Sequence, residues 1–291
     1  MSAPMQLSRR SILAAAAGAA GALAAVPLSF ADDPTEPQAK TKGRINQSVC
    51  AWCYGQMSLD ELCKHAARIG YKSVELTGPR DWPTIKKHGL ICAMYSDVSI
   101  GKGYNRKEHH AELNEAVNKA IDQAAEAGFP NVICMSGNRD GQDPEQGIKN
   151  CIEGVKQVVG HAEQKGVNVC MEFLNSKVDH KDYDFDHMAY GVAVAKAVGS
   201  ERFGILYDIY HAQIMEGDII RTIHDYHQYI RHYHTGGNPG RHEIDDTQEL
   251  NYAAIMKAIA ATGYKGYVGQ EFIPKGDPVK GLENAFKICD V

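Results

Sequence analysis

Strand-like and helical segments alternate strictly along most of this chain, and this alternation restricts the possible folds more than any other feature. Eight short apolar runs have the length and composition of buried β-strands, and they cover residues 45–50, 72–77, 90–95, 131–136, 167–173, 203–208, 230–234 and 266–272. Helical patterns lie between them at 58–69, 81–88, 106–128, 145–165, 184–199, 217–228, 248–262 and 278–289. Repeated βα units place parallel strands side by side with helices outside them. We therefore predict an α/β fold, a single (β/α)8 TIM barrel.

Length and composition agree with one such barrel. The chain has 291 residues, and a barrel of this type uses roughly 250. Hydrophobic residues make up 44% and charged residues 23%, as in ordinary globular proteins. The net charge is −5 and long basic runs are absent, so we expect a small-molecule partner and no nucleic acid. A homo-oligomer is left open.

The N-terminal segment has the features of a twin-arginine signal. The pair Arg9-Arg10 precedes a weakly apolar stretch rich in Ala and Gly, and small residues ending at Ala31 suit cleavage. The stretch is short and Ala-rich for a membrane span, so we expect a periplasmic or otherwise exported protein with no stable membrane association after cleavage. The predicted organisation is a signal peptide at 1–31, a flexible leader at 32–43 and the barrel domain at 44–291.

The eight cysteines all follow the predicted signal peptide. The spacing of Cys50 and Cys53 suits a redox or zinc motif, but no second CxxC accompanies it, and the pair follows a strand instead of opening a helix. Whether these two form a disulfide is left open. Cys92, Cys134 and Cys170 stand inside apolar strand runs and are expected to be buried small hydrophobic residues.

Four residues with metal-binding or acid–base chemistry stand near the ends of successive strand-like runs. They are Glu172, Asp208, His234 and Glu271, in the runs VCMEF, GILYD, IRHYH and YVGQE. Any one of them alone is better explained as an ion-pair partner or a helix N-cap. The C-terminal ends of barrel strands, however, meet at one mouth. The sequence therefore predicts that all four side chains converge there.

Three carboxylates and one imidazole at one point suit a divalent metal ion such as Mn²⁺, Mg²⁺ or Co²⁺. Without a cation, crowded carboxylates repel one another and one of them stays protonated. A bound ion would act as a Lewis acid towards a substrate with adjacent oxygens. Glu172 and Glu271 would then be the pair that removes a proton from one carbon and returns it to the next.

Several segments resemble hydroxypyruvate isomerases, which belong to the wider xylose-isomerase-like barrel family. The matching segments are Met171–His180, Asp208–Gly217, Asn238–Glu243 with Glu249–Tyr252, and Gly269–Phe272. The motifs DIYHAQIMEG and NPGRHE are specific, and the resemblance covers about residues 45–290. Hydroxypyruvate isomerases usually have glutamine where this chain has His234, whereas related sugar epimerases have histidine.

The resemblance implies an isomerase of the intramolecular aldose–ketose type with one divalent ion bound by Glu172, Asp208, His234 and Glu271. It implies that Glu172 and Glu271 are also catalytic. Substrate contacts are implied for His211 and Arg241, with His180 and Lys177 nearby. Arginine is common in the family at position 177, and a lysine lacks its bidentate grip on a carboxylate.

Other functions remain open for this sequence. A ketose 3-epimerase or an inosose-type isomerase or dehydratase would use the same metal site. A periplasmic sugar-binding barrel would be non-catalytic, although both proton-transfer glutamates are present. A metal-dependent endonuclease would need more ligands and a basic rim. His232, two residues before His234, is either a polar core residue or a partner of that ligand.

Overall fold

The computed structural model describes residues 41–95 and 97–291. The predicted signal peptide at 1–31 and most of the predicted leader at 32–43 lie outside the described residues. The described residues form one compact unit, which contains the predicted barrel domain. In the described part of the chain, no helix is both long enough and apolar enough to cross a membrane.

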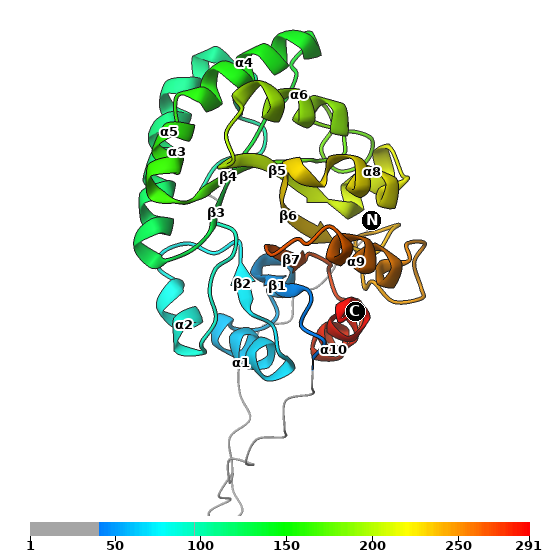
Figure 1. Cartoon of the computed structure of the whole chain (residues 1–291). Helices are drawn as coiled ribbons and strands as arrows, with labels where there is room; N and C mark the ends of the chain where they lie inside the picture. The colour runs from blue at the N-terminus through cyan, green and yellow to red at the C-terminus, as the bar shows by residue number, and fades with distance from the viewer. Residues whose placement is uncertain (1–40, 96) are drawn as a thin grey trace, which may run out of the picture. The chain divides into compact units, whose positions relative to one another are not determined.

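Seven parallel strands form a sheet at the centre of this unit (Figure 1). The strands are β1 (Asn46–Cys50), β2 (Ser73–Glu75), β3 (Asn131–Cys134), β4 (Asn168–Glu172), β5 (Phe203–Asp208), β6 (Ile230–Thr235) and β7 (Tyr267–Gln270). Their order in the sheet is β2-β1-β7-β6-β5-β4-β3, so the first and last strands of the chain are neighbours. The parallel pairing of β1 with β7 is the pairing of first and last strands that is expected when a sheet closes into a barrel.

The gap between β2 and β3 is bridged by the segment that was predicted as a strand at 90–95. The segment is not a regular strand, because it makes only single parallel bridges, from Ile91 to Ser73 and from Tyr95 to Val132. Side chains replace part of the ladder: the backbone of Ala93 donates to Oγ of Ser73 at 2.8 Å and accepts from the Asn131 amide at 2.7 Å. The segment nevertheless connects both edges of the sheet, which confirms the single TIM barrel.

Ten α-helices are present in the described residues, and Figure 1 shows them outside the strands. They are α1 (Leu59–Ile69), α2 (Trp82–Lys87), α3 (His110–Ala127), α4 (Pro144–Lys156), α5 (Val159–Lys165), α6 (Met188–Val198), α7 (Ile209–Met215), α8 (Ile219–Tyr226), α9 (Tyr252–Ala261) and α10 (Pro278–Cys289). Short 3₁₀ turns cover Ala51–Tyr54, Lys107–His109 and His227–Tyr229.

Two helical predictions need correction. The single helix predicted at 145–165 is divided, because α4 closes with i to i+3 bonds at Gln157 and Val158 before α5 begins. Helix α7 was not predicted at all. It starts directly after β5, because the carboxylate of Asp208 caps it by accepting hydrogen bonds from the backbone of Tyr210 and His211.

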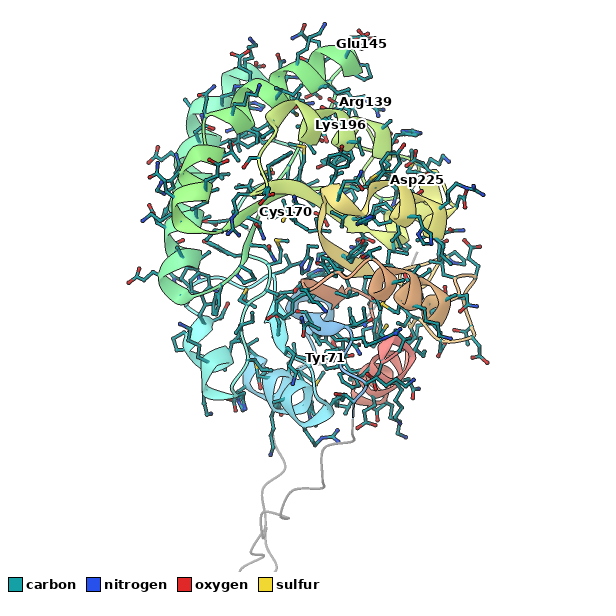
Figure 2. The ribbon with its side chains drawn as sticks, viewed as in Figure 1. Tyr71, Arg139, Glu145, Cys170, Lys196 and Asp225 are labelled. Carbon is teal, nitrogen blue, oxygen red and sulfur yellow. The ribbon has the colours of Figure 1, made fainter. Side chains whose placement is uncertain are left out.

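Helix ends follow their sequence signals. Ser58 and Glu61 form a capping box at the start of α1, and Gly70 ends that helix at a φ of 116°, a conformation that favours glycine. The next residue, Tyr71, turns inward towards α10 (Figure 2). Its hydroxyl donates to the carbonyl oxygen of Leu282 at 2.9 Å, and its ring meets Phe286 edge-on. This contact joins the first and last helices of the barrel.

The interior of the barrel is lined by alternate residues of each strand. Figure 2 shows Cys170 inside the ring, whereas the exposed Glu145 and Asp225 point away from it. His232 and His234 share the inner face of β6 and are both fully buried. Beneath Glu172 and Glu271 lie the small residues Cys170 and Gly269, which leave space for polar side chains at the mouth.

Candidate active site

Four polar side chains converge where strands β4 to β7 end. Glu172 and Asp208 are the last residues of β4 and β5, His234 is the last but one of β6, and Glu271 follows β7. One donor atom from each lies within 4.8 Å of the other three, and all four residues are buried. The structure therefore brings together the four residues that the sequence predicted as metal ligands.

The donor atoms are arranged as ligands are, and not as a hydrogen-bonded cluster. Nδ1 of His234 lies 2.8 Å from Oε2 of Glu271 and 3.7 Å from Oε1 of Glu172. Among the described side chains, this Nδ1 and this Oε2 have no partner in hydrogen-bond geometry although both are buried, and Oε2 has only an ion-pair contact with Arg241 at 2.7 Å. Buried polar atoms normally find partners. A divalent cation would satisfy both, so the residues present fit such an ion.

Crowding and burial change the acidity of the three carboxyl groups. Burial raises the pKa of Asp208 to about 8, and Arg241 offsets part of that rise. Burial also raises the pKa of Glu172. For Glu271 burial acts in the same direction, but Arg241 and His234 outweigh it and hold the pKa well below the usual range. Burial therefore favours the protonated form of each carboxyl group, and nearby positive charge favours the ionised form.

Arg241 supplies one such charge from the loop after β6. Its Nη2 lies 2.7 Å from Oε2 of Glu271 and 3.1 Å from Oδ2 of Asp208. The guanidinium packs between the rings of Trp52 and Tyr210, at 5.3 and 5.2 Å from their centroids. This predicted substrate residue thus directly contacts two of the four candidate metal ligands.

His211, on α7, points its Nε2 towards the same cluster. Its Nδ1 lies 2.6 Å from the Asn175 amide nitrogen, and the Asn175 carbonyl oxygen accepts backbone hydrogen bonds from residues 178 and 179. The amide nitrogen therefore faces the ring, which leaves the proton on Nε2. Nε2 lies 3.5 Å from Oδ2 of Asp208 and has no hydrogen-bond partner among the described side chains. It is a donor available to a ligand oxygen.

The other two residues predicted to lie near the substrate, His180 and Lys177, lie in different places. His180 lines the pocket, with its ring 5.3 Å from that of His211. Lys177 does not reach the pocket, which corrects its predicted placement. Its Nζ donates to the carbonyl oxygens of Ile214 and Met215, both at 3.0 Å, because the C-terminal end of α7 attracts a cation.

A cavity of about 390 Å³ opens beside these groups. Glu172, Glu271, His180 and Arg241 contribute its charged and titratable lining. The remaining lining is the indole of Trp52 and the apolar side chains of Leu76, Val98, Ile100, Ile133, Met135 and Leu174. Apolar walls keep water away and so strengthen the electrostatic interactions at the polar groups.

Sequence reasoning missed two residues of this site: Asn175 orients His211, and Oε1 of Glu75 lies 2.8 Å from Nε2 of His234. For Trp52 it left open whether the ring forms a wall of the site or only packs at the barrel rim; Trp52 donates from Nε1 to Oε1 of Glu271 at 2.8 Å. For Glu75 a signal existed, since an acidic residue stands inside an apolar strand run. Cys50 and Cys53 are buried free thiols, so the structure has no disulfide between them.

We predict that Glu172→Gln stabilises the metal-free protein by about 0.5–2 kcal/mol, because it removes a buried charge from a crowded site. Glu115→Gln, on the exposed side of α3 and away from the ends of that helix, is the control and should change little. Urea unfolding of both variants after metal removal measures the difference. A Glu172→Gln variant that is less stable than wild type would show that this carboxylate is well compensated within the protein.

Comparison with known proteins identifies the family. A family model described as a xylose isomerase-like TIM barrel matches residues 63–288. A 2-oxo-tetronate isomerase of Haemophilus influenzae is 28% identical over 231 residues, which cover 75% of this chain and 89% of the relative. A human protein provisionally named hydroxypyruvate isomerase is 28% identical over 237 residues, 80% of each chain.

Solved structures agree with this assignment. A family 2 AP endonuclease from Brucella melitensis superposes with a TM-score of 0.74 at 26% identity, covering 82% of this chain and 97% of that one. A D-psicose 3-epimerase from Clostridium cellulolyticum shares the fold, with a TM-score of 0.66 at 18% identity, covering 84% and 97%. The relatives named as isomerases confirm the prediction of an enzyme of the isomerase class. The chain belongs to the xylose isomerase-like TIM-barrel family.

Proposed function

We propose that this protein is a metal-dependent isomerase that moves a proton between adjacent carbons of a small hydroxycarbonyl acid, of the hydroxypyruvate or 2-oxo-tetronate kind. The observation that carries the proposal is the convergence of Glu172, Asp208, His234 and Glu271 within 4.8 Å beside a pocket. The relatives named as isomerases of such compounds support the substrate class.

These four residues would hold one divalent ion, Mn²⁺, Mg²⁺ or Co²⁺, which supplies Lewis-acid polarisation of the substrate carbonyl when bound. Proton transfer falls to Glu172 and Glu271, since both carboxylates line the pocket. One carboxylate would take the proton from the carbon beside the carbonyl, and the other, starting protonated, would give a proton to the neighbouring carbon. The hydroxyl proton that must pass from one substrate oxygen to the other would restore both groups. Trp52 holds Glu271 through the bond to Oε1, which leaves Oε2 facing the cluster.

Substrate oxygens would be recognised by His211 and Arg241. The Nε2–H of His211 is a buried donor without a partner among the described side chains, so a substrate oxygen would complete its hydrogen bonding. Arg241 would pair with a substrate carboxylate, since a guanidinium offers two parallel donors to it. His180 lies on the same wall of the pocket and would contact the remaining oxygens.

The test of the proton-transfer role is Glu271→Gln. The change keeps the size of the side chain and removes its ability to accept a proton, so turnover should fall by at least roughly 10²-fold. The assay uses hydroxypyruvate and related acids with added Mn²⁺, with Glu145→Gln as the control. Chelation should abolish activity and Mn²⁺ should restore it. Turnover near the wild-type level in Glu271→Gln would remove this residue from the mechanism.

A ketose 3-epimerase is the second candidate. His234 favours it, because histidine at this position is typical of the epimerases that the sequence resembles. The two functions differ in whether the substrate carries a carboxylate, and among the described residues that line the pocket only Arg241 is a permanent cation. Arg241 therefore offers the test between them.

Arg241→Ala should lower kcat/KM for an acid substrate by roughly 10- to 150-fold, since a charge-assisted bond contributes about 1.5–3 kcal/mol. A neutral ketose should lose much less. Mn²⁺ affinity is measured in the same variant, because Arg241 also contacts two candidate ligands. Equal losses for both substrate classes would make the role of Arg241 structural. A wild-type enzyme that uses only neutral ketoses would favour the epimerase.

A further inference from the structure

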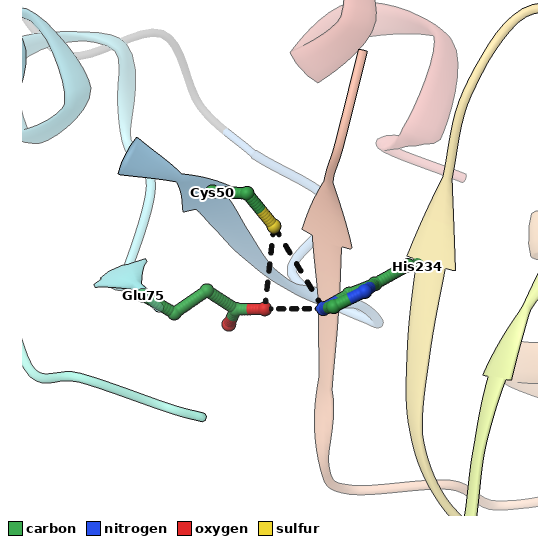
Figure 3. Close-up of side chains that lie close together, drawn as sticks. All are labelled: Cys50, Glu75 and His234. Carbon is green, nitrogen blue, oxygen red and sulfur yellow. Dashed lines mark hydrogen bonds and ion pairs between the residues drawn. The ribbon is translucent and has the colours of Figure 1, made fainter. Parts of the chain in front are cut away.

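A buried carboxylate lies directly beneath the candidate metal ligands, and none of the proposed steps uses it. Glu75 is the last residue of β2 and is fully buried. Its Oε1 lies 2.8 Å from Nε2 of His234 and 2.8 Å from Nε2 of His232. Figure 3 shows Glu75 and Cys50 facing the His234 ring from the strands opposite it. One carboxylate oxygen therefore holds two imidazoles of β6.

This contact determines which nitrogen of His234 is free. Oε1 of Glu75 lies 2.8 Å from Nε2 of His232 and 2.8 Å from Nε2 of His234. A carboxylate oxygen that meets two ring nitrogens accepts a hydrogen bond from each, so Nε2 of His234 carries the proton. The lone pair of a neutral ring then lies on Nδ1. Nδ1 is the atom that faces Glu271 and Glu172.

Packing in the barrel interior preserves this arrangement. A Cβ atom at Gly269 of β7 would lie 2.4 Å from Oε1 of Glu75 and 2.8 Å from Cδ2 of His234. Glycine at this position leaves the space through which Glu75 reaches the ring. A larger residue would displace one partner or the other.

Cys50 also contacts Glu75 and His234, so it serves as a control for the role of Glu75. Its Sγ lies 3.6 Å from Oε1 of Glu75 and 3.7 Å from Nε2 of His234, longer contacts than those between Glu75 and the two imidazoles. Burial keeps this thiol protonated by raising its pKa well above the usual value. A neutral thiol is a weak donor, so it does not orient the ring as a carboxylate does.

We propose that Glu75 is a positioning residue that holds His234 in the Nε2–H form, with Nδ1 directed at the other three candidate ligands, and so sets the affinity for the divalent ion. His232 shares the oxygen and keeps it in place. Outer partners of this kind fix the tautomer and orientation of a metal-binding histidine. The inference rests on the metal centre of the proposed function. The part that concerns the tautomer of His234 applies to the metal-free protein as well.

The first measurement is the ¹⁵N NMR spectrum of the histidine rings in the metal-free wild-type chain. At a pH high enough to make the ring neutral, His234 should show a protonated Nε2 and an unprotonated Nδ1, and a Glu75→Gln variant should lose that preference. A wild-type His234 with its proton on Nδ1 would overturn this inference alone and leave the proposed function standing. Because this measurement uses the unaltered protein, it does not depend on the folding of a variant.

The second measurement is calorimetric titration with Mn²⁺ of wild type, Glu75→Gln and the control Cys50→Ser. Glu75→Gln should weaken binding by roughly 10- to 100-fold, as is typical when such a partner is changed, whereas Cys50→Ser should stay close to wild type. Unchanged affinity in Glu75→Gln would overturn the inference. If the wild-type chain binds two Mn²⁺ ions and each variant binds only one, the inference is wrong, and Cys50, Glu75 and His234 hold a second ion instead. A wild-type chain that binds no Mn²⁺ would overturn the proposed function itself.

Discussion

Repulsion among three buried carboxylates is the constraint on which the active-site mouth of this protein depends. Two like charges about 4 Å apart repel by about 4 kcal/mol at an effective dielectric constant of about 20. Glu172, Asp208 and Glu271 approach one another this closely because they end three of four successive strands. Arg241 compensates one charge, and a divalent cation would compensate two more. The rigid barrel holds the groups in place despite the repulsion.

The side chains around the three carboxylates, His234, His211 and Arg241, are positioned by contacts with further residues of the protein. Glu75 fixes the His234 ring, Asn175 fixes the His211 ring, and Trp52 with Tyr210 encloses the guanidinium of Arg241. Each of these contacts restrains a side chain before any ligand arrives. Preorganised donors need little rearrangement during a reaction, which is the main way in which a site of this kind lowers a barrier.

The fold and the four converging residues could be predicted because they follow from local patterns. Apolar runs and turn signals predict eight strands, of which seven are regular strands in the structure, and residues at strand ends must meet at one mouth. The irregularity of the segment at 90–95 could not be predicted, since side chains of Ser73 and Asn131 replace part of its ladder bonds. Helix α7 was missed because no turn residue separates it from β5.

Side-chain direction was the least predictable property. Lys177 and His180 belong to one loop, yet Lys177 binds the end of α7 while His180 lines the pocket. Glu75 lies far from His234 in sequence, and only the closed barrel brings them together. No periodicity along the chain encodes such contacts across the interior. They depend on the tertiary arrangement of β1, β2, β6 and β7.

The central claim is that one divalent ion occupies the point between the four strand ends. Anomalous diffraction from crystals of the full chain grown with Mn²⁺ tests it most directly. We expect a single strong peak at about 2.0–2.6 Å from donor atoms of Glu172, Asp208, His234 and Glu271, the usual range for oxygen-rich sites. A peak at a different place, or no peak at saturating Mn²⁺, would contradict the account.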